Sequence, residues 1–442
     1  MTVEIAVMNK MGVALAADSA VTINSGRKIF HSANKLFMLS KYHPVGVMIY
    51  NNSLFLGCPW EVLIKEYRAC LGDKPYATIE EYGNSFIEWL KSSVTTYDLQ
   101  GSDNLFREYV SSAYYRLAYY VGDVLSSMGL AAAGSNEAIK AIVEREISSY
   151  VDSIRVKKKM RGVPKEFQAK AKERYSPIID KMLERIFDTA YLTNQAKEIL
   201  REYPIVFLEH GELSDLFTGV VIAGYGSSEI YPRLIEYTVD GYFLGWLRHT
   251  KGDVKKINDK NGALIRAYAQ NDVVTTFMEG ADPIYDKLIE KYVYNLLHSQ
   301  YPKAILAELK TDDESAKIGL EKRLQETAAR LMHDFSNVIK QHKNVSHIWP
   351  VMGTIRSLPR DELAVVAETL ANLTSFKRKV SPESETVGGP IDVCVISKGD
   401  GFVWIKRKHY FKPELNRHFF DNYFRDKGGE GTNDNLAQPQ RR

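Results

Sequence analysis

The second residue, Thr2, carries a hydroxyl that could attack a carbonyl carbon once a base removes its proton. If Met1 is removed, Thr2 supplies that base itself, because an N-terminal α-amine has an unperturbed pKa of roughly 7.7 to 8.0. A small second residue is the kind that methionine removal accepts, so no propeptide is required. The alternative is that Thr2 merely follows the initiator methionine, and Thr2 taken alone favours that alternative.

Two charged residues could tune such a nucleophile. Alternating apolar residues predict a β-hairpin over residues 3–17 with its turn near residues 10 and 11, which places Asp18 opposite or diagonal to the first residues. Lys35 directly precedes an apolar triplet, so a strand there carries its ammonium toward the interior, where a carboxylate must compensate its burial. Asp18 is the candidate partner. The alternative is a solvated lysine at a strand edge and a solvated aspartate at a hairpin end.

The elements that must position these residues are short strands and amphipathic helices. A helix follows Pro59, another follows the capping box of Thr78 and Glu81, and a third follows Pro359. Two stretches, residues 96–212 and 286–354, are expected to be helical insertions. Periodicity and β-branched residues predict further strands at 35–39, 45–50, 217–223, 233–239, 391–396 and 402–405, and a β region that ends near 273–277.

Two segments resemble a known family. Residues 1–7, Gly12 to Ser19 with Thr22, and Asn34 to Phe37 resemble the start of proteasome β subunits and related N-terminal-nucleophile (Ntn) hydrolases, and residues 388–401 resemble their closing hairpin. The resemblance is strongest in residues 2–70 and 358–405. It implies an atypical bacterial-type member with an α+β fold, a four-layer αββα sandwich with large helical insertions. The expected domain spans residues 1–410, and a C-terminal extension spans 411–442, disordered beyond about 424.

The resemblance also implies a function, a proteasome-like threonine-type amidohydrolase or peptidase. Thr2 would be the nucleophile, Asp18 and Lys35 would tune it, and the backbone N–H of Asn51 would donate to the oxyanion. Asn51 stands where the family usually has glycine. The family's later serine and aspartate residues are not matched one for one, and Ser384, Glu385 or Thr386 could substitute for them. The alternative function is a catalytically silent scaffold or assembly subunit.

Composition limits the partners. Lys and Arg number 58 and Asp and Glu 55, so a net charge of +3 implies no polyanionic partner, and the basic stretch 155–174 is expected to be a solvated helix face. No apolar run approaches the roughly 20 residues of a membrane span. With three cysteines and no apolar leader, we expect a cytoplasmic protein without disulfides. We expect a peptide or amide substrate, no metal or cofactor, no nucleic acid and, by resemblance, a ring-shaped homo-oligomer. The sequence does not identify the substrate.

Overall fold

A computed structural model describes residues 3–23, 28–30, 33–96, 102–128, 136–210, 213–308, 313–381 and 388–424. The chain divides into two compact units, residues 1–406 and 407–442. The predicted disorder beyond about residue 424 lies outside the described residues. The division into one domain of residues 1–410 with two insertions stays a prediction.

The strands form two larger antiparallel sheets and two short ribbons. In order across the first sheet are β13 (Ala263–Ala269), β1 (Val3–Asn9), β2 (Gly12–Ala17), β14 (Asp392–Ser397) and β15 (Gly401–Lys406). Across the second are β11 (Trp246–Lys251), β10 (Arg233–Phe243), β9 (Thr218–Gly224), β6 (Val45–Asn51) and β5 (Leu36–Met38), with β12 (Lys255–Lys256) beside β10. The ribbons pair β3 (Val21–Ile23) with β4 (Lys28–Phe30), and β7 (Leu54–Phe55) with β8 (Cys58–Pro59).

Helices make up most of the remaining structure, so the fold is α+β. The first group comprises α1 (Trp60–Leu71), α2 (Ile79–Thr96), α3 (Ser102–Ser127), α4 (Asn136–Arg155), α5 (Phe167–Ile186), η1 (Thr189–Tyr191) and α6 (Asn194–Glu209). The second comprises α7 (Asp272–Glu279), α8 (Pro283–Asn295), η2 (Leu296–Gln300), α9 (Tyr301–Glu308), α10 (Glu314–Lys343), η3 (Asn344–Ile348), α11 (Trp349–Ser357) and α12 (Arg360–Val380). The short η4 (Pro413–Leu415) and α13 (Arg417–Phe424) lie in the second unit.

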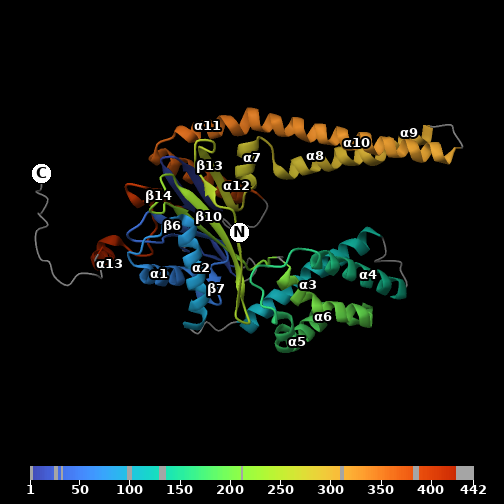
Figure 1. The fold of residues 1–442 in the computed structure, drawn as a ribbon, viewed down its shortest axis with the longest axis horizontal. Helices are drawn as coiled ribbons and strands as arrows, with labels where there is room; N and C mark the ends of the chain where they lie inside the picture. Colours follow the sequence, from blue (N-terminus) through green and yellow to red (C-terminus); the bar gives the residue numbers. More distant parts are fainter. Residues whose placement is uncertain are drawn as a thin grey trace, which may run out of the picture. The chain divides into compact units, whose positions relative to one another are not determined.

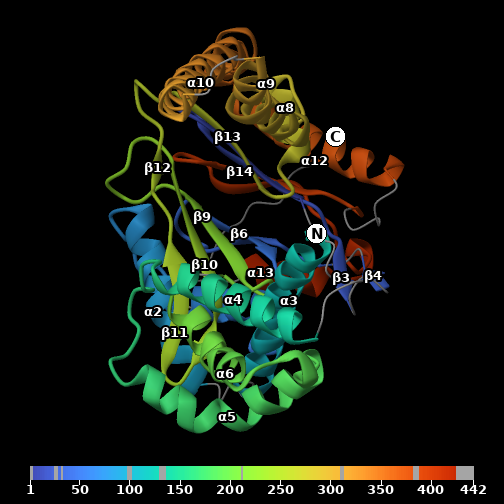
Figure 2. The same ribbon diagram turned by 90° about the vertical axis from the view of Figure 1, so that its right-hand side faces the viewer.

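The alternation of side chains along β1 distributes them between two buried clusters. Ala6 and Met8 join residues of both sheets in the cluster between them. Ile5 and Val7 face the opposite way and pack with residues of α12. Residues of α1 and α2 cover the other face of the second sheet, and Figure 2 shows α2 and α12 on different sides of the strands. Residues 3–9 are therefore held inside a packed sheet, between β13 and β2.

Helices α3 to α6 build a separate cluster, which also takes in Phe243 and Trp246 from the second sheet. A fully buried guanidinium, that of Arg248 on β11, connects the two regions. It donates to the carboxylate of Asp240 and, through Nε at 2.9 Å, to the carbonyl oxygen of Leu208 in the last turn of α6. This ion pair ties the end of the helical cluster to the sheet.

The β region predicted to end near residues 273–277 is wrong, because these residues form the helix α7 while the strand β13 ends at Ala269. Val273 and Val274 favour a strand locally, but both are buried, and Val274 packs in the cluster with residues of α12. Gly280 then ends the helix with a left-handed φ of 73°. Tertiary packing outweighed the β-propensity of the valines.

Candidate functional site

The hairpin of β1 and β2 places Asp18 at the start of the chain. Its register pairs Glu4 with Ala17, so the next pair along the hairpin is Val3 with Asp18. The backbone N–H of Asp18 donates to the carbonyl oxygen of Val3 at 3.0 Å, and the N–H of Val3 donates to Asp18 Oδ1 at 3.2 Å. The carboxylate of Asp18 is therefore bonded to Val3, the residue that follows Thr2 in the chain.

Lys35 approaches the same carboxylate from the second sheet. Its carbonyl oxygen accepts a hydrogen bond from the N–H of Ile49 on β6 at 2.8 Å, which fixes its backbone. Its Nζ lies 2.5 Å from Asp18 Oδ1, and the two residues are 4% and 0% exposed. A buried ion pair of this kind offsets the desolvation of both charges only when its geometry is close. The structure thus brings Asp18 and Lys35 together in the interior.

Two further groups converge on this pair. Glu4 has no exposed surface, and its Oε1 lies 3.4 Å from Lys35 Nζ. The N–H of Gly388 donates to Asp18 Oδ2 at 3.1 Å, so the segment before β14 contacts the start of the chain. Sequence reasoning missed both groups. Glu4 could have been found, because strand alternation places it on the same face as the apolar residues Ala6 and Met8, where a charged residue is unusual. No local pattern points to Gly388.

The other predicted site residues are described only in part. Thr2, Ser384, Glu385 and Thr386 lie outside the described residues. Asn51 ends β6 with a left-handed φ of 71°, a conformation that asparagine adopts more readily than most residues. Its side-chain amide donates to the carbonyl oxygens of two residues before β9, at 2.7 and 3.1 Å. Asn51 is therefore fixed two residues beyond Ile49, whose N–H holds Lys35.

Polar side chains continue from Glu4 into the space between the sheets. Tyr268 is paired with Glu4 across β1 and β13, and its ring centroid lies 5.3 Å from that of Tyr50. The Tyr50 hydroxyl donates to Glu236, which also accepts from Arg266 at 2.8 Å. Burial raises the pKa of Tyr268 well above its usual value, and burial together with the Glu236 contact does the same for Tyr50. Both phenols therefore stay protonated well above neutral pH.

The charges of Lys35 and Asp18 can change the protonation of neighbouring groups. Within the part of the chain that the structure describes, no group of three or more His, Cys, Asp or Glu side chains could hold a metal ion. A buried ammonium favours the deprotonated forms of a neighbouring hydroxyl or amine, and its paired carboxylate keeps the ammonium charged.

None of the described helices is both long enough and apolar enough to cross a membrane.

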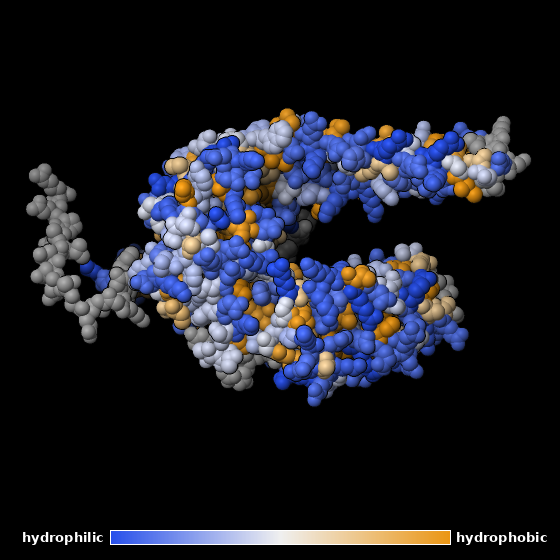
Figure 3. All heavy atoms as spheres, in the orientation of Figure 1, coloured by the Kyte–Doolittle hydropathy of each residue, from blue (hydrophilic) through white to orange (hydrophobic). Residues whose placement is uncertain are grey.

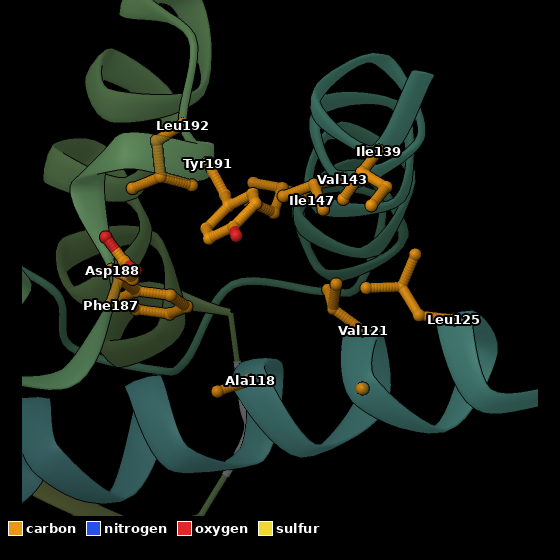
Figure 4. A pocket seen from close by; sticks show the side chains of 11 residues that line it. Ala118, Val121, Leu125, Ile139, Val143, Ile147, Phe187, Asp188, Tyr191 and Leu192 are labelled. Carbon is orange, nitrogen blue, oxygen red and sulfur yellow. The ribbon is translucent and has the colours of Figure 1, made fainter. Parts of the chain in front are cut away.

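Cavities also lie away from the pair of Asp18 and Lys35. One of about 350 Å³ lies among α3, α4 and η1 and is lined mainly by apolar side chains (Figure 4). Its one acidic lining residue, Asp188, is exposed, and its carboxylate accepts from the N–H of Ala190 at 3.0 Å. A second cavity of about 400 Å³ begins next to Asn51. Its lining residues are Asn52, Leu54, Phe55, Leu56, Gly57, Asn104, Leu105, Glu108, Leu216, Thr218, Val239, Asp240 and Gly241.

Comparison with known proteins gives a limited result. No family model matches the chain, and no curated protein matches it. Among solved structures, it is similar to Anbu (ancestral beta-subunit) from Yersinia bercovieri, with 9% identity, a TM-score of 0.26 and coverage of 98% of this chain and 100% of that one. Anbu from Hyphomicrobium sp. strain MC1 has 8% identity and a TM-score of 0.25, covering 95% and 94%. The helical assembly of the Anbu complex from Pseudomonas aeruginosa has 10% identity and a TM-score of 0.21, covering 95% and 93%.

The sequence was assigned to the Ntn hydrolases as an atypical bacterial-type relative of proteasome β subunits. This family assignment is wrong. The matching structures are Anbu proteins, and their TM-scores of 0.21 to 0.26 are too low to establish a shared fold. The physical reason is the local nature of the motifs. Residues 1–19 and 388–401 specify two hairpins, and a hairpin does not determine the path of the rest of the chain.

Proposed function

We propose that the protein is a threonine-type amidohydrolase that cleaves amide or peptide bonds, with Thr2 as its nucleophile after removal of Met1. One observation carries this proposal. A buried ammonium, Lys35 Nζ, lies 2.5 Å from a carboxylate that is itself bonded to the N–H of Val3, the residue after Thr2. An amine and a hydroxyl on residue 2 would lie near this ammonium, whose positive charge favours their deprotonated forms.

In the proposed reaction, the α-amine of Thr2 takes the proton of the hydroxyl as its oxygen attacks the carbonyl carbon. The amine then gives that proton to the leaving nitrogen, and an acyl ester remains on Thr2. Water, deprotonated by the same amine, attacks the ester and releases the acyl group. Lys35 stabilises the developing negative charge near the nucleophile. The backbone N–H of Asn51 is the proposed oxyanion donor, and the residues proposed to support the amine are Ser384, Glu385 or Thr386.

The test uses a peptide epoxyketone, an electrophile that both a hydroxyl and a neighbouring amine can attack. We expect one adduct per chain, on the N-terminal peptide, in protein whose intact mass shows loss of Met1. Lys35→Met removes the charge but keeps most of the side-chain volume, and it should slow labelling by at least about 100-fold. Lys35→Arg should also fail, because a planar guanidinium does not replace a compact ammonium.

The matched control is Lys10→Met. Lys10 also pairs with an aspartate, Asp259, but this pair is at the surface, with side chains 33% and 85% exposed. Its labelling rate should stay within about twofold of wild type, since an exposed pair contributes little. Labelling of folded Lys35→Met at the wild-type rate would show that Lys35 has another role. A folded wild-type protein with Thr2 at its N-terminus and no adduct would favour the alternative, a catalytically silent scaffold.

We also propose that the protein self-associates through the helical hairpin of α8, α9 and α10 (Figure 1). Apolar side chains remain on the outer face of α8, where Tyr285, Leu288 and Tyr292 are 58%, 62% and 62% exposed at helical spacing. On α10, Leu331 and Val338 are 50% and 64% exposed and seven residues apart. Figure 3 shows these helices with apolar patches among charged residues.

A second copy of the hairpin suits this face because its charges balance. Residues 283–343 carry ten basic and nine acidic side chains, so two copies meet without strong repulsion. Two such hairpins can bury their apolar stripes in a four-helix bundle. Light scattering at micromolar concentration should show an oligomer that Leu288→Lys with Leu331→Lys dissociates. Ile230→Lys, at an apolar residue 79% exposed outside the hairpin, should leave it intact. A monomeric wild type would refute self-association.

A further inference from the structure

Glu4 is a second buried carboxylate beside the Lys35 ammonium. Its neighbours on the same face of β1, Ala6 and Met8, belong to the core between the sheets, and Glu4 has no exposed surface. Burying a carboxylate at such a position is costly unless other charges compensate it. The distance of 3.4 Å between Glu4 Oε1 and Lys35 Nζ means that Glu4 and Asp18 share one ammonium.

Glu4 is also close to residue 2 along the chain. Two residues of a polypeptide span at most about 7 Å between their Cα atoms, so only that length of chain separates Glu4 from the residue that would carry the α-amine of a mature N-terminus. A carboxylate within a few ångströms favours the protonated form of an amine and raises its pKa. The ammonium of Lys35 acts in the opposite direction. The protonation of the α-amine would therefore depend on both residues.

We propose that Glu4 is a positioning residue of the proposed site. It helps to hold Lys35 between two carboxylates, and it keeps the α-amine of residue 2 protonated up to a higher pH than Lys35 and Asp18 alone would. This inference rests on the proposed function, in which the neutral α-amine is the base. Its consequence is a hydrolase whose activity rises toward alkaline pH and whose pH profile Glu4 controls.

Other charged and titratable groups face the same space. Asp392 on β14 is buried and, through its register with Ala17, lies in one row with Glu4 across the first sheet. The carboxylates of Asp392 and Asp18, like that of Glu4, favour the protonated amine and raise its pKa. Removing Glu4 should therefore lower the pKa of the amine only in part. The ion pair of Arg266 and Glu236 adds no net charge. Among the described residues, the phenols of Tyr50 and Tyr268 also lie between the sheets.

The test measures the amine directly rather than activity. Protein whose first residue is Thr2, released by cleavage of an N-terminal fusion, is acetylated with trace isotopic acetic anhydride from about pH 5 to about pH 10, and the N-terminal peptide is quantified by mass spectrometry. We expect the amine of Glu4→Gln to titrate about one pH unit below that of wild type. Glu4→Asp, which keeps the charge, and Asp259→Asn, which removes an exposed carboxylate, should titrate as wild type does.

An unchanged titration in folded Glu4→Gln would overturn the inference. If Glu4→Gln does not fold, Glu4→Thr removes the same charge with a residue that strands accommodate well. Failure of the proposed function is distinguishable from this outcome, because acetylation requires no catalysis. If wild type shows no epoxyketone adduct but Glu4→Gln lowers the pKa of the α-amine, the proposed hydrolase function is refuted and the electrostatic role of Glu4 stands. If wild type forms the adduct but Glu4→Gln leaves the pKa of the α-amine unchanged, only the inference about Glu4 is refuted.

Discussion

Replacing Arg248 with methionine should destabilise the attachment of the helical cluster to the second sheet. The Arg248 guanidinium donates to Asp240 and to the carbonyl oxygens of Phe207 and Leu208, and Arg248 has no exposed surface. Without it, the bonds that remain to the carboxylate of Asp240 from the described residues come from the N–H and hydroxyl of Ser214. Two carbonyl groups at the end of α6 lose these donors as well.

The expected loss follows from burial. Removing one partner of a buried ion pair costs about 3–5 kcal/mol, because the other charge stays in the interior without compensation. The matched control is Arg116→Met, since Arg116 pairs with Asp215 where the side chains are 32% and 70% exposed. Screening by water limits that pair to about 1 kcal/mol at most. The two variants lose the same side chain and differ in the burial of the aspartate left behind and in the two carbonyl groups of α6 that lose a donor in Arg248→Met.

Urea unfolding followed by tryptophan fluorescence suits this test, because Trp246 packs in the affected cluster, 5.2 Å from the ring of Phe167. At a slope of about 3 kcal/mol per molar urea, the Arg248→Met midpoint should fall by about 1 M or more. Adding Asp240→Leu to Arg248→Met should recover part of the loss, because an apolar pair leaves no buried charge. A midpoint equal to that of Arg116→Met would refute this account of the ion pair.

Three further outcomes are expected. Gly219→Ala should destabilise the protein by about 1–3 kcal/mol in the same urea assay, because a Cβ there would lie 1.8 Å from the Tyr50 ring. With a thiol reagent, exposed Cys70 should react in the native protein, whereas Cys394, buried in the core with a strongly raised pKa, should react only after unfolding. Thr78→Ala should lower stability by about 1 kcal/mol, because the Thr78 hydroxyl accepts the N–H of Glu81 at the start of α2, and a thermal scan would measure this.

Local rules predicted the N-terminal part of the site. The alternation of residues 3–17 and the position of the turn indicated the hairpin, and the hairpin brings Asp18 to Val3. The apolar residues after Lys35 correctly indicated a buried side chain. These features depend on neighbouring residues, so their periodicity is visible in one sequence.

Long-range contacts could not be predicted in this way. Gly388 reaches Asp18 across 370 positions, and nothing in the residues around it encodes that contact. The valines of α7 favoured a strand because their burial beside residues of α12 is invisible to local propensity. Glu4 was overlooked although its parity placed it in the core. The family assignment failed for a related reason, since hairpin motifs describe only a small part of the backbone.

The order of strands in the first sheet has a consequence for synthesis. The β1–β2 hairpin is synthesised before its neighbours in the sheet, β13 and β14, which end at residues 269 and 397. At about 5–20 residues per second, the hairpin waits about 20–80 s for its last partner, with both edges open to wrong pairing. The contact from Gly388 to Asp18 also forms only after residue 388 has been synthesised. A chain that stops before β14 therefore lacks this contact and keeps an open edge on β2, which makes it prone to aggregate.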